Sequence, residues 1–439
     1  MPFSSAVGSV ATPLVAGQFS VTGLSFQPKA LILYWTVGTA DGAVANMTLG
    51  FGGAVSDTSQ FVVYNVDLDA VATVDSGRKH DSTRCYADTN TSGTFTASAS
   101  FVSFNSDGFT LNLVNESGEA RIINYIALGG TTLTNAAIKA FQSPGSVSTV
   151  GYTGVGFTPD AVLFFSAQQA TASPNGGSAT AWLSAGFATA TAQVALNART
   201  DDSDSVQDAS HGQNAAIALL AQNPAASISM KATLASLDAD GFTLTYSASS
   251  TAAFVYALCL KGGSYNVGEI SQKTSTGTQA YTGVGFKPSV VMLLSANDAT
   301  DSDTEAHYNI STGAATFGLA QGSVWAGSVD AADPTQSDSY LDRTNVIRMM
   351  TAGTPSTEAI AAYTSSDNDG FTLNWTTADA TARKILYLAI GPAHGGGGGG
   401  GGGNRPPRPP GGGPPGQPPG GGTFSGPVLK KIRFPEKVI

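Results

Sequence analysis

A five-residue phrase, Asp-Gly-Phe-Thr-Leu, occurs three times in the chain, at residues 107–111, 240–244 and 369–373. The phrase is typical of a tight turn that leads into a strand. Asp can bond its own backbone, Gly accepts positive φ, and Phe-Thr-Leu alternates apolar and polar residues. An apolar run precedes each copy, so run, turn and run together indicate a β-hairpin. Because the copies lie about one domain length apart, we expect an internal triplication.

Two further phrases repeat in the same order around each hairpin. One is a Gly-containing turn followed by aromatic-x-Pro and an apolar run, at residues 23–33, 154–164 and 283–293. Proline is tolerated at the first position of a strand, and short runs rich in Val, Leu and Ile favour buried strands. The other is a closing apolar run with glycine at or just after its end, at residues 122–129, 254–260 and 385–391. Three phrases in one order, three times over, strengthen the prediction of a triplication.

The fold class follows from these phrases and from the composition. Only 12% of the residues are charged, Gly-rich turns are frequent, and no segment has a convincing amphipathic helical pattern. The Ala-rich stretches 193–198 and 213–226 could hide short helices, but they lack a 3.6-residue apolar stripe. We expect an all-β protein of three tandem antiparallel β-sandwiches that pack around a pseudo-threefold axis, at residues 1–130, 131–263 and 264–392.

Charge and cysteine content limit the classes of function. The formal net charge is −10 and the sequence pI is about 4.7, which disfavours nucleic-acid binding. Cys85 and Cys259 lie at non-equivalent places in two repeats, so we expect free thiols in a reducing compartment. No apolar segment reaches 18 residues, so no membrane span is expected. The start of the chain lacks a signal-peptide pattern, and we expect synthesis in a cytoplasm without secretion by that route.

The composition changes abruptly after the third repeat. Residues 393–422 are rich in Gly and Pro, which predicts a linker that is flexible in its Gly part and stiffer in its Pro part. Residues 423–439 are basic and apolar, and we expect them to anchor the protein to a partner by adding a strand to an open sheet edge. A disordered solubilising tail is the alternative. The residues expected to make the anchor are Val428, Leu429, Lys430, Lys431, Ile432, Arg433 and Phe434.

One group of residues has the composition of a nucleophilic or metal site. His80 lies near Asp81, Arg84 and Cys85 in the sequence. The group does not recur in the other repeats, and a Cys/His pair also needs an orienting partner. We therefore interpret it as an ordinary polar loop, and we expect no catalytic residue, no resident metal and no cofactor.

Each repeat also carries an Asp-rich loop, at residues 75–92, 199–213 and 331–345. Acidic oxygens suit Ca²⁺, but the spacing of an EF-hand is missing, so solvated loops are the preferred interpretation and calcium binding stays open. The densest acidic clusters are Asp201, Asp202 and Asp204, and Asp301, Asp303 and Glu305.

The repeated phrases resemble units of bacteriophage virion proteins, in which small β-domains are strung in tandem. The resemblance covers residues 23–391 and rests on Gly-x-x-Phe-x-Pro, Asp-Gly-Phe-Thr-Leu and, in the first repeat, Tyr-x-Ala-Leu-Gly. It implies a structural, non-enzymatic protein of a tail fibre, a baseplate or a head decoration, present in many copies and bound to other virion proteins. The tether with its basic peptide departs from this pattern and favours an anchored decoration.

Two other functions are weighed against this one. The first is a glycan-binding module for host attachment that uses the Asp-rich loops and exposed tryptophans, although tryptophan more often packs in a core or an interface. The second is a glycan-degrading enzyme. The tryptophans concerned are Trp35, Trp182, Trp325 and Trp375.

Overall fold

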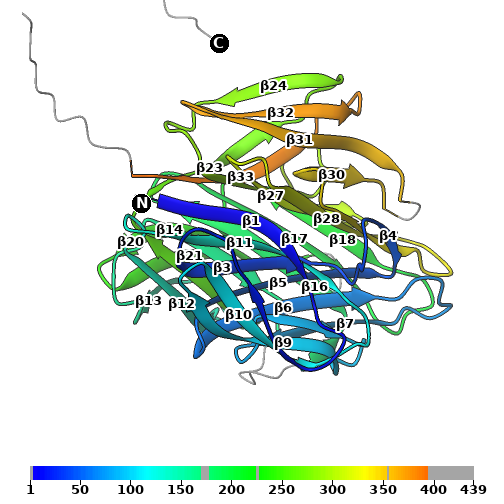
Figure 1. The fold of residues 1–439 in the computed structure, drawn as a ribbon. Coiled ribbons are helices and arrows are strands. Elements are labelled where there is room, and N and C mark those ends of the chain that lie inside the picture. The colour runs from blue at the N-terminus through cyan, green and yellow to red at the C-terminus, as the bar shows by residue number, and fades with distance from the viewer. Residues whose placement is uncertain (1–2, 170–176, 224–226, 353–354, 394–439) are drawn as a thin grey trace, which may run out of the picture. The chain divides into compact units, whose positions relative to one another are not determined.

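The computed structural model describes residues 3–169, 177–223, 227–352 and 355–393, which form strands, turns and loops. No helix occurs in these ranges, and the strands form six antiparallel sheets (Figure 1). The prediction of an all-β, sandwich-like fold is confirmed. The Ala-rich stretch 193–198 lies within a strand rather than a helix. Apart from Ala393, the predicted linker and anchoring peptide lie outside the described residues.

The first repeat forms one large and one small sheet. The large sheet has the order β1-β11-β3-β5-β6-β7, and the small sheet has the order β2-β10-β9-β8. The strands are β1 (Phe3–Ala11), β2 (Gly17–Val21), β3 (Pro28–Trp35), β4 (Gly42–Ala45), β5 (Met47–Ser56), β6 (Ser59–Asp67), β7 (Ser76–Asp81), β8 (Tyr86–Thr89), β9 (Phe95–Asn105), β10 (Gly108–Asn115) and β11 (Ile122–Gly130).

The second repeat has the same strand order. Its large sheet runs β12-β22-β14-β16-β17-β18, and its small sheet runs β13-β21-β20-β19. The strands are β12 (Asn135–Gln142), β13 (Thr149–Thr153), β14 (Ala161–Ser166), β15 (Gly177–Ala179), β16 (Ala181–Thr189), β17 (Gln193–Thr200), β18 (Ala209–Asn214), β19 (Leu219–Gln222), β20 (Ile228–Asp238), β21 (Gly241–Ser249) and β22 (Phe254–Lys261).

The third repeat follows the same plan. Its large sheet runs β23-β33-β25-β27-β28-β29, and its small sheet runs β24-β32-β31-β30. The strands are β23 (Ser264–Ser271), β24 (Gly277–Thr282), β25 (Val290–Ser295), β26 (Ser302–Ala306), β27 (Tyr308–Thr316), β28 (Gln321–Ser328), β29 (Ser337–Asp342), β30 (Ile347–Met350), β31 (Thr357–Asp367), β32 (Gly370–Thr377) and β33 (Lys384–Gly391).

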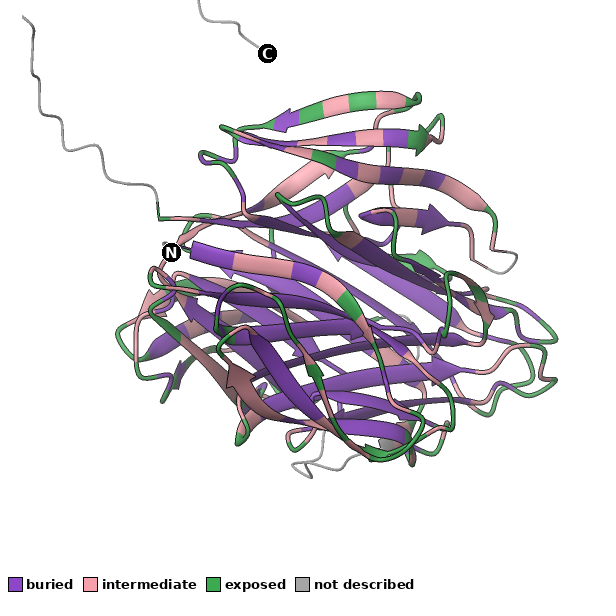
Figure 2. Ribbon diagram, in the orientation of Figure 1, coloured by how far each residue is buried: buried purple, intermediate pink, exposed green. Residues whose placement is uncertain are grey.

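The large sheets are buried on both faces, which explains their continuous apolar runs. In β3, Ile32 and Tyr34 face a core shared by all three repeats, whereas Leu31, Leu33 and Trp35 face the small sheet of the first repeat. Alternate residues of a strand point to opposite faces, so burial of both faces favours an apolar residue at nearly every position, as in β3. Figure 2 shows the inner strands of the large sheets as mostly buried, whereas the edge strand β1 is only partly buried.

The shared core joins the repeats through direct ring contacts. Phe165 of the second repeat packs against Phe51 and Phe61 of the first, with ring centroids 5.2 and 5.4 Å apart. Phe61 also stacks on Tyr256 at 5.1 Å. The third repeat adds Leu294 and other apolar residues to the same cluster. Aromatic pairs of this kind add to the stabilisation from burial.

Each large sheet is completed by a seventh strand from another repeat. Strand β15 pairs with β7, β26 pairs with β18, and β4 pairs with β29. The second repeat therefore extends the sheet of the first, the third extends that of the second, and the first extends that of the third. The described part of the chain is thus an interlocked ring of three repeats; the sequence predicted three sandwiches around a pseudo-threefold axis but not the exchange of strands between them. The predicted domain bounds, at residues 1–130, 131–263 and 264–392, stay a prediction.

The repeated phrases meet in space and hold each sandwich together. Asp240, in the turn between β20 and β21, accepts hydrogen bonds from the backbone N–H groups of Gly154 (2.9 Å) and Gly156 (2.5 Å). These bonds lower the pKa of the Asp240 carboxyl. Asp369 binds its own Gly-x-Gly turn in the same way, and Asp107 binds the N–H of Gly23. In each repeat, the Asp of the Asp-Gly-Phe-Thr-Leu phrase is therefore hydrogen-bonded to the glycine turn that precedes the aromatic-x-Pro phrase.

Candidate functional site

The residues predicted to anchor the protein, Val428 to Phe434, lie outside the described residues. Their role stays a prediction.

His80 and Asp81 lie in the buried strand β7, so the prediction of a polar loop is wrong for them. The residues near His80 do not form a nucleophilic site. The His80 ring is buried, its Nδ1 lies 3.0 Å from the Tyr256 hydroxyl, and it stacks on Phe254. Cys85 is buried in the sandwich core instead, where its thiol donates to the carbonyl of Ala99. Burial raises the pKa of the Cys85 thiol to about 12, so the reactive thiolate is not populated near neutral pH. Cys259 is likewise a buried free thiol with a pKa of about 12.

The segments predicted to be Asp-rich loops contain strands or parts of strands, including β7, β8, β18 and β29, and they contact one another across the three repeats. The N–H of Ser76 donates to Asp202 (2.9 Å), and the N–H of Val74 donates to the carbonyl of Asp204. The loop after β28 joins them, because the N–H of Gln207 donates to the carbonyl of Ala332. Nothing in the polar composition of these segments indicates that they contact one another.

Asp67, the last residue of β6, lies where the three loops meet. Its Oδ2 accepts bonds from Ser328 (2.8 Å) and Ser337 (2.7 Å) of the third repeat, and from the Gln207 amide of the second. Its Oδ1 has no hydrogen-bond partner among the residues that the structure describes. Burial raises the pKa of Asp67 from 3.8 to about 7. This carboxyl is therefore a structural junction between all three repeats.

The acidic clusters considered for Ca²⁺ are engaged by the protein itself. Arg199 pairs with Asp201 and Asp208, and Lys384 pairs with Asp301 (3.1 Å). Asp303 pairs with Lys231. No group of three or more His, Cys, Asp or Glu side chains suited to a metal ion occurs in the described ranges.

The four tryptophans divide into two kinds. Trp35, Trp325 and Trp375 are fully buried, and each indole N–H has an acceptor: Asp88, Asn309 and the Tyr281 hydroxyl respectively. Trp182 is only half-buried, and the Arg78 guanidinium lies 4.1 Å from its ring centroid. Among the tryptophans, Trp182 alone is placed to contact a ligand.

Three equivalent side chains fasten the exchanged strands. Arg78, His211 and Ser339 are each the third residue of their strands, β7, β18 and β29. Each donates to the backbone carbonyl of the residue that follows an exchanged strand. These bonds go to Thr180 (3.1 Å), His307 (2.7 Å) and Asn46 (2.9 Å) respectively.

The three accepting residues share an unusual backbone conformation. Asn46, Thr180 and His307 have φ values of 72°, 72° and 74°. Positive φ is uncommon for residues other than glycine, and it turns the chain from the exchanged strand back into its own sheet. The three boundaries between repeats therefore share one backbone conformation and one hydrogen bond. They differ in the side chains that surround this bond.

At the boundary of the second and third repeats, a polar cavity of about 510 Å³ surrounds His211. The Nδ1 of His211 faces the His307 carbonyl, and its Nε2 lies 3.0 Å from Asp298 Oδ1. Both partners are acceptors, so the doubly protonated ring satisfies both. Burial opposes that form, but the bonds to Asp298 outweigh it and raise the pKa of His211. Arg383 and Glu358 add a further ion pair at 3.6 Å.

At the boundary of the first and second repeats, a smaller cavity of about 220 Å³ lies beside Arg78. Gln168, which follows β14, and Trp182, in β16, line it together with Met230, Ala221 and Ala253. Among the described residues, three fully buried N–H donors of the lining side chains have no hydrogen-bond partner: Arg78 Nε, Gln168 Nε2 and Trp182 Nε1. Buried donors are normally satisfied, but other buried donors of the described residues, such as Asn197 Nδ2 and Arg199 Nε, also have no partner.

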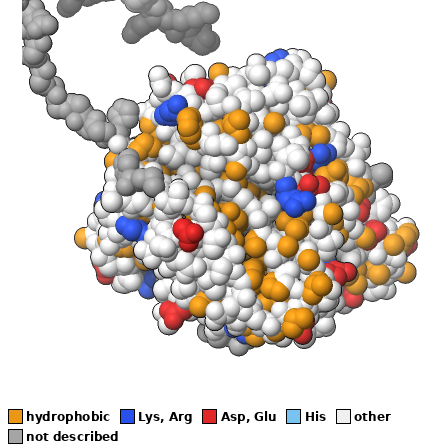
Figure 3. All heavy atoms as spheres, in the orientation of Figure 1, with side chains coloured by type: hydrophobic (Ala, Val, Ile, Leu, Met, Phe, Trp, Pro, Cys, Tyr) orange, Lys and Arg blue, Asp and Glu red, His pale blue; other side chains and the backbone are white. Residues whose placement is uncertain are grey.

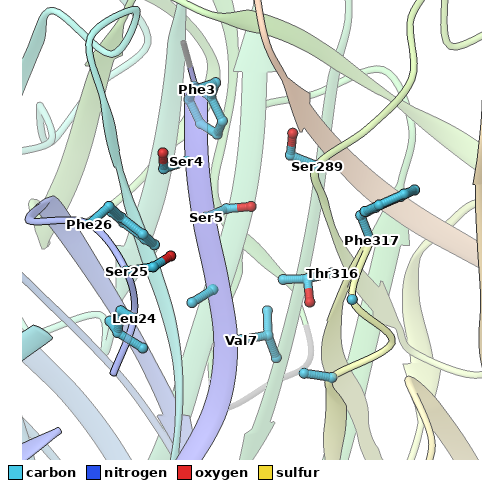
Figure 4. Close-up of a pocket in the computed structure, with 13 residues that line it drawn as sticks. Phe3, Ser4, Ser5, Val7, Leu24, Ser25, Phe26, Ser289, Thr316 and Phe317 are labelled. Atoms are coloured by element: carbon cyan, nitrogen blue, oxygen red, sulfur yellow. The ribbon is translucent and has the colours of Figure 1, made fainter. Parts of the chain in front are cut away.

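A shallow apolar groove lies between the first and third repeats. Figure 4 shows Phe3 and Val7 of β1 on one wall and Ser289, Thr316 and Phe317 on the other. Phe317 is 60% exposed in the turn between β27 and β28. The groove is lined by apolar side chains together with hydroxyl-bearing residues such as Ser4, Ser289 and Thr316.

The surface and the comparisons give few other indications. On the face drawn in Figure 3, charged side chains occur singly or in small groups between hydrophobic ones. The described residues contain no helix that could cross a bilayer. Searches against protein-family models and curated protein sequences find no match for the chain.

The sequence did not single out Arg78, Gln168 or His211. One signal was available: aligned on the repeated Phe-x-Pro phrase, Val37, Gln168 and Asn297 are equivalent. A polar residue thus follows a buried strand in two of the three repeats. The partners of Arg78 and His211 come from other repeats, and no local pattern reveals such contacts.

Proposed function

We propose that the chain is a non-enzymatic structural protein of a bacteriophage virion, a head decoration or a tail component, present in many copies. It is made in the host cytoplasm and is held on the particle by its C-terminal peptide. The observation that carries this proposal is the cyclic exchange of β4, β15 and β26. Exchange of these strands joins the three repeats into a single body. Such a body suits a rigid structural protein better than a protein whose domains must move.

The chemistry of the buried groups supports the same proposal. The histidine and cysteine that the sequence brings together lie in different packing environments, and both thiols have raised pKa values. Asp67 and the tryptophans Trp35, Trp325 and Trp375 serve packing and hydrogen bonding. The resemblance of the repeated motifs to virion proteins supports a location on the virion. The basic, apolar C-terminal peptide supports attachment to the particle.

Deletion of residues 424–439 tests the attachment. We expect the shortened chain to keep its folded body and to be missing from purified particles, measured as copies per particle by quantitative gel or mass spectrometry. A matched control shortens the glycine run 395–403 but keeps the peptide, and this variant is expected to incorporate normally. Normal occupancy of the particle by the peptide-deleted chain would show that the peptide is not the anchor.

A further inference from the structure

The cavity around His211 has a counterpart at the same place in each of the other two repeats. Four equivalent positions line all three cavities: the second residue of the strand after the exchanged strand, the second residue of the first hairpin strand (β9, β20 or β31), the residue directly after β8, β19 or β30, and the residue directly before β11, β22 or β33. In the third repeat these residues are Asn309, Glu358, Thr351 and Arg383. Because the cavity recurs three times, the fold itself produces it, and the side chains of each repeat determine what it can hold.

Among the three, only the cavity of the third repeat has the size of a ligand site. The cavities of the first and second repeats measure about 210 and 220 Å³, whereas that of the third repeat measures about 510 Å³. Pockets for small molecules measure roughly 300–1,000 Å³. Of these three cavities, the one around His211 is therefore the candidate.

The wall of this cavity carries polar side chains that solvent can reach. Glu305 and His307 are exposed. The side chains of Arg383, Glu358 and Asp298 keep 24%, 19% and 12% of their accessible surface. Since all five residues line the cavity, a ligand in it can contact them.

The hydrogen bonds of the wall leave both a donor and acceptors for a ligand. The N–H of Asp330 donates to His307 Nδ1 (2.9 Å), so the neutral ring carries its proton on Nε2, which is a donor. The Oε2 of Glu358 accepts from the Asn297 amide, which leaves Oε1 as an acceptor. The exposed carboxylate of Glu305 adds further acceptors. A ligand that both donates and accepts hydrogen bonds matches this wall.

Charge and polarity limit the class of ligand further. The lining contains carboxylates, but it also contains Arg383 and His211, which pair with Glu358 (3.6 Å) and Asp298 (3.0 Å) respectively. A cation or an anion would therefore meet groups of its own sign. The apolar side chains of the lining are those of three alanines, so an apolar ligand would gain little from burial. A neutral ligand rich in hydroxyl groups meets none of these objections.

We propose that this cavity binds a neutral sugar, whose hydroxyl groups donate to Glu305 and Glu358 and accept from His307. A hydroxyl group is both a donor and an acceptor, so adjacent hydroxyls of one ring serve both kinds of wall group. The equivalent cavities lack this arrangement, because Thr96 and Ser229 stand in the place of Glu358. The site goes beyond the proposed structural role and does not involve the attachment peptide, so sugar binding and particle assembly can fail independently.

The test is a ligand-observed NMR titration of the full-length chain with glucose, galactose, mannose, rhamnose and N-acetylglucosamine. Putrescine, citrate and benzyl alcohol represent a cation, an anion and an apolar ligand. We expect at least one sugar to bind saturably with a Kd of about 1 mM or below, and more tightly than these three compounds. The proposal is overturned if none of the five sugars binds up to about 10 mM. It is also overturned if putrescine, citrate or benzyl alcohol binds more tightly than every sugar.

Two variants and a matched control locate the binding. Glu305→Ala removes an exposed acceptor and is expected to weaken binding about tenfold, because hydrogen bonds to charged groups are the stronger ones. His307→Asn removes the imidazole donor and is expected to weaken binding about fivefold. It keeps the fold, because Asn46 has the same positive φ at the equivalent position of the first repeat. Glu116→Ala removes an exposed glutamate outside the cavity and is expected to leave affinity unchanged.

A denaturation curve of each variant checks its fold. Full affinity in Glu305→Ala, whose side chain is exposed, overturns the proposal. Full affinity in folded His307→Asn, or an equal loss of affinity in Glu116→Ala, overturns it as well.

Discussion

The glycines of the three Asp-Gly-Phe-Thr-Leu phrases are required by close contacts with a neighbouring strand, and the sequence alone does not reveal these contacts. Gly108, Gly241 and Gly370 begin the second strand of each hairpin. A Cβ at any of the three would overlap a backbone carbonyl of the neighbouring strand, at Val21, Tyr152 and Tyr281 respectively. The sequence indicated glycine for a turn, and the turn is present. The second requirement, space for another backbone, arises only when the two phrases of a repeat meet.

Gly241→Ala is therefore expected to be strongly destabilising. The added methyl group must displace the Tyr152 carbonyl, and the backbone φ of 149° is also unfavourable for alanine. We expect a loss of about 3 kcal/mol or more in the free energy of unfolding, measured by chemical denaturation. Gly151→Ala in the adjacent strand is the control, because its Cβ would meet only Thr243 Oγ1 at 3.4 Å. A comparable loss in both variants would contradict this explanation.

At the scale of elements, the sequence predicted the strands that carry an apolar pattern and missed those that do not. The runs around β3, β14 and β25 were identified because burial on both faces makes every position apolar. The exchanged strands β4, β15 and β26 contain small or polar residues, such as Gly42, Ser178 and Asp303. These strands are fixed by pairing with another repeat, so their own residues carry no strand signal. The cavity beside Arg78 was missed for the same reason, since it forms only when two repeats meet.

The loops that meet at Asp67 give the fold a pH dependence. The pKa of Asp67 is raised on folding, so the folded state holds this proton more tightly than the unfolded state does. Its stabilising contribution is complete below the usual pKa of 3.8 and is lost as the pH rises through about 7. The difference between the two pKa values of Asp67 corresponds to a change of about 4 kcal/mol at most in the free energy of unfolding. The carboxyls of Asp88 and Asp338, with pKa values raised to about 6, act in the same direction.

We expect the free energy of unfolding to be larger at pH 5 than at pH 8, and Asp67→Asn to reduce this difference. The amide cannot ionise, but it can still occupy the place of the protonated carboxyl. Asp57→Asn, in an exposed turn, is the control and is expected to keep the full difference. Denaturant titrations at the two pH values give the measurement. An unchanged pH dependence in Asp67→Asn would exclude this carboxyl as its main source.

At the scale of the whole molecule, two features join the repeats: the shared core and the exchanged strands. A single repeat would expose Phe51 and Phe61 to water and would leave β7 without β15. Exposed apolar faces and open sheet edges favour association or unfolding over a stable monomer. The sequence gives three copies of one motif set, which is compatible with separate domains as well as with a ring. The difference depends on contacts between residues more than a hundred positions apart, such as Tyr34 with Gly322.

The most direct test of the interlocked ring is the behaviour of residues 1–130 expressed alone, compared with residues 1–393. Size-exclusion chromatography with light scattering and a denaturation curve give the mass and the cooperativity of each. If the ring is the folding unit, the longer chain is a monomer with a single cooperative transition, and the first repeat alone is either unfolded or assembled into oligomers. A folded monomer of residues 1–130 with its own cooperative transition would contradict the interlocked ring.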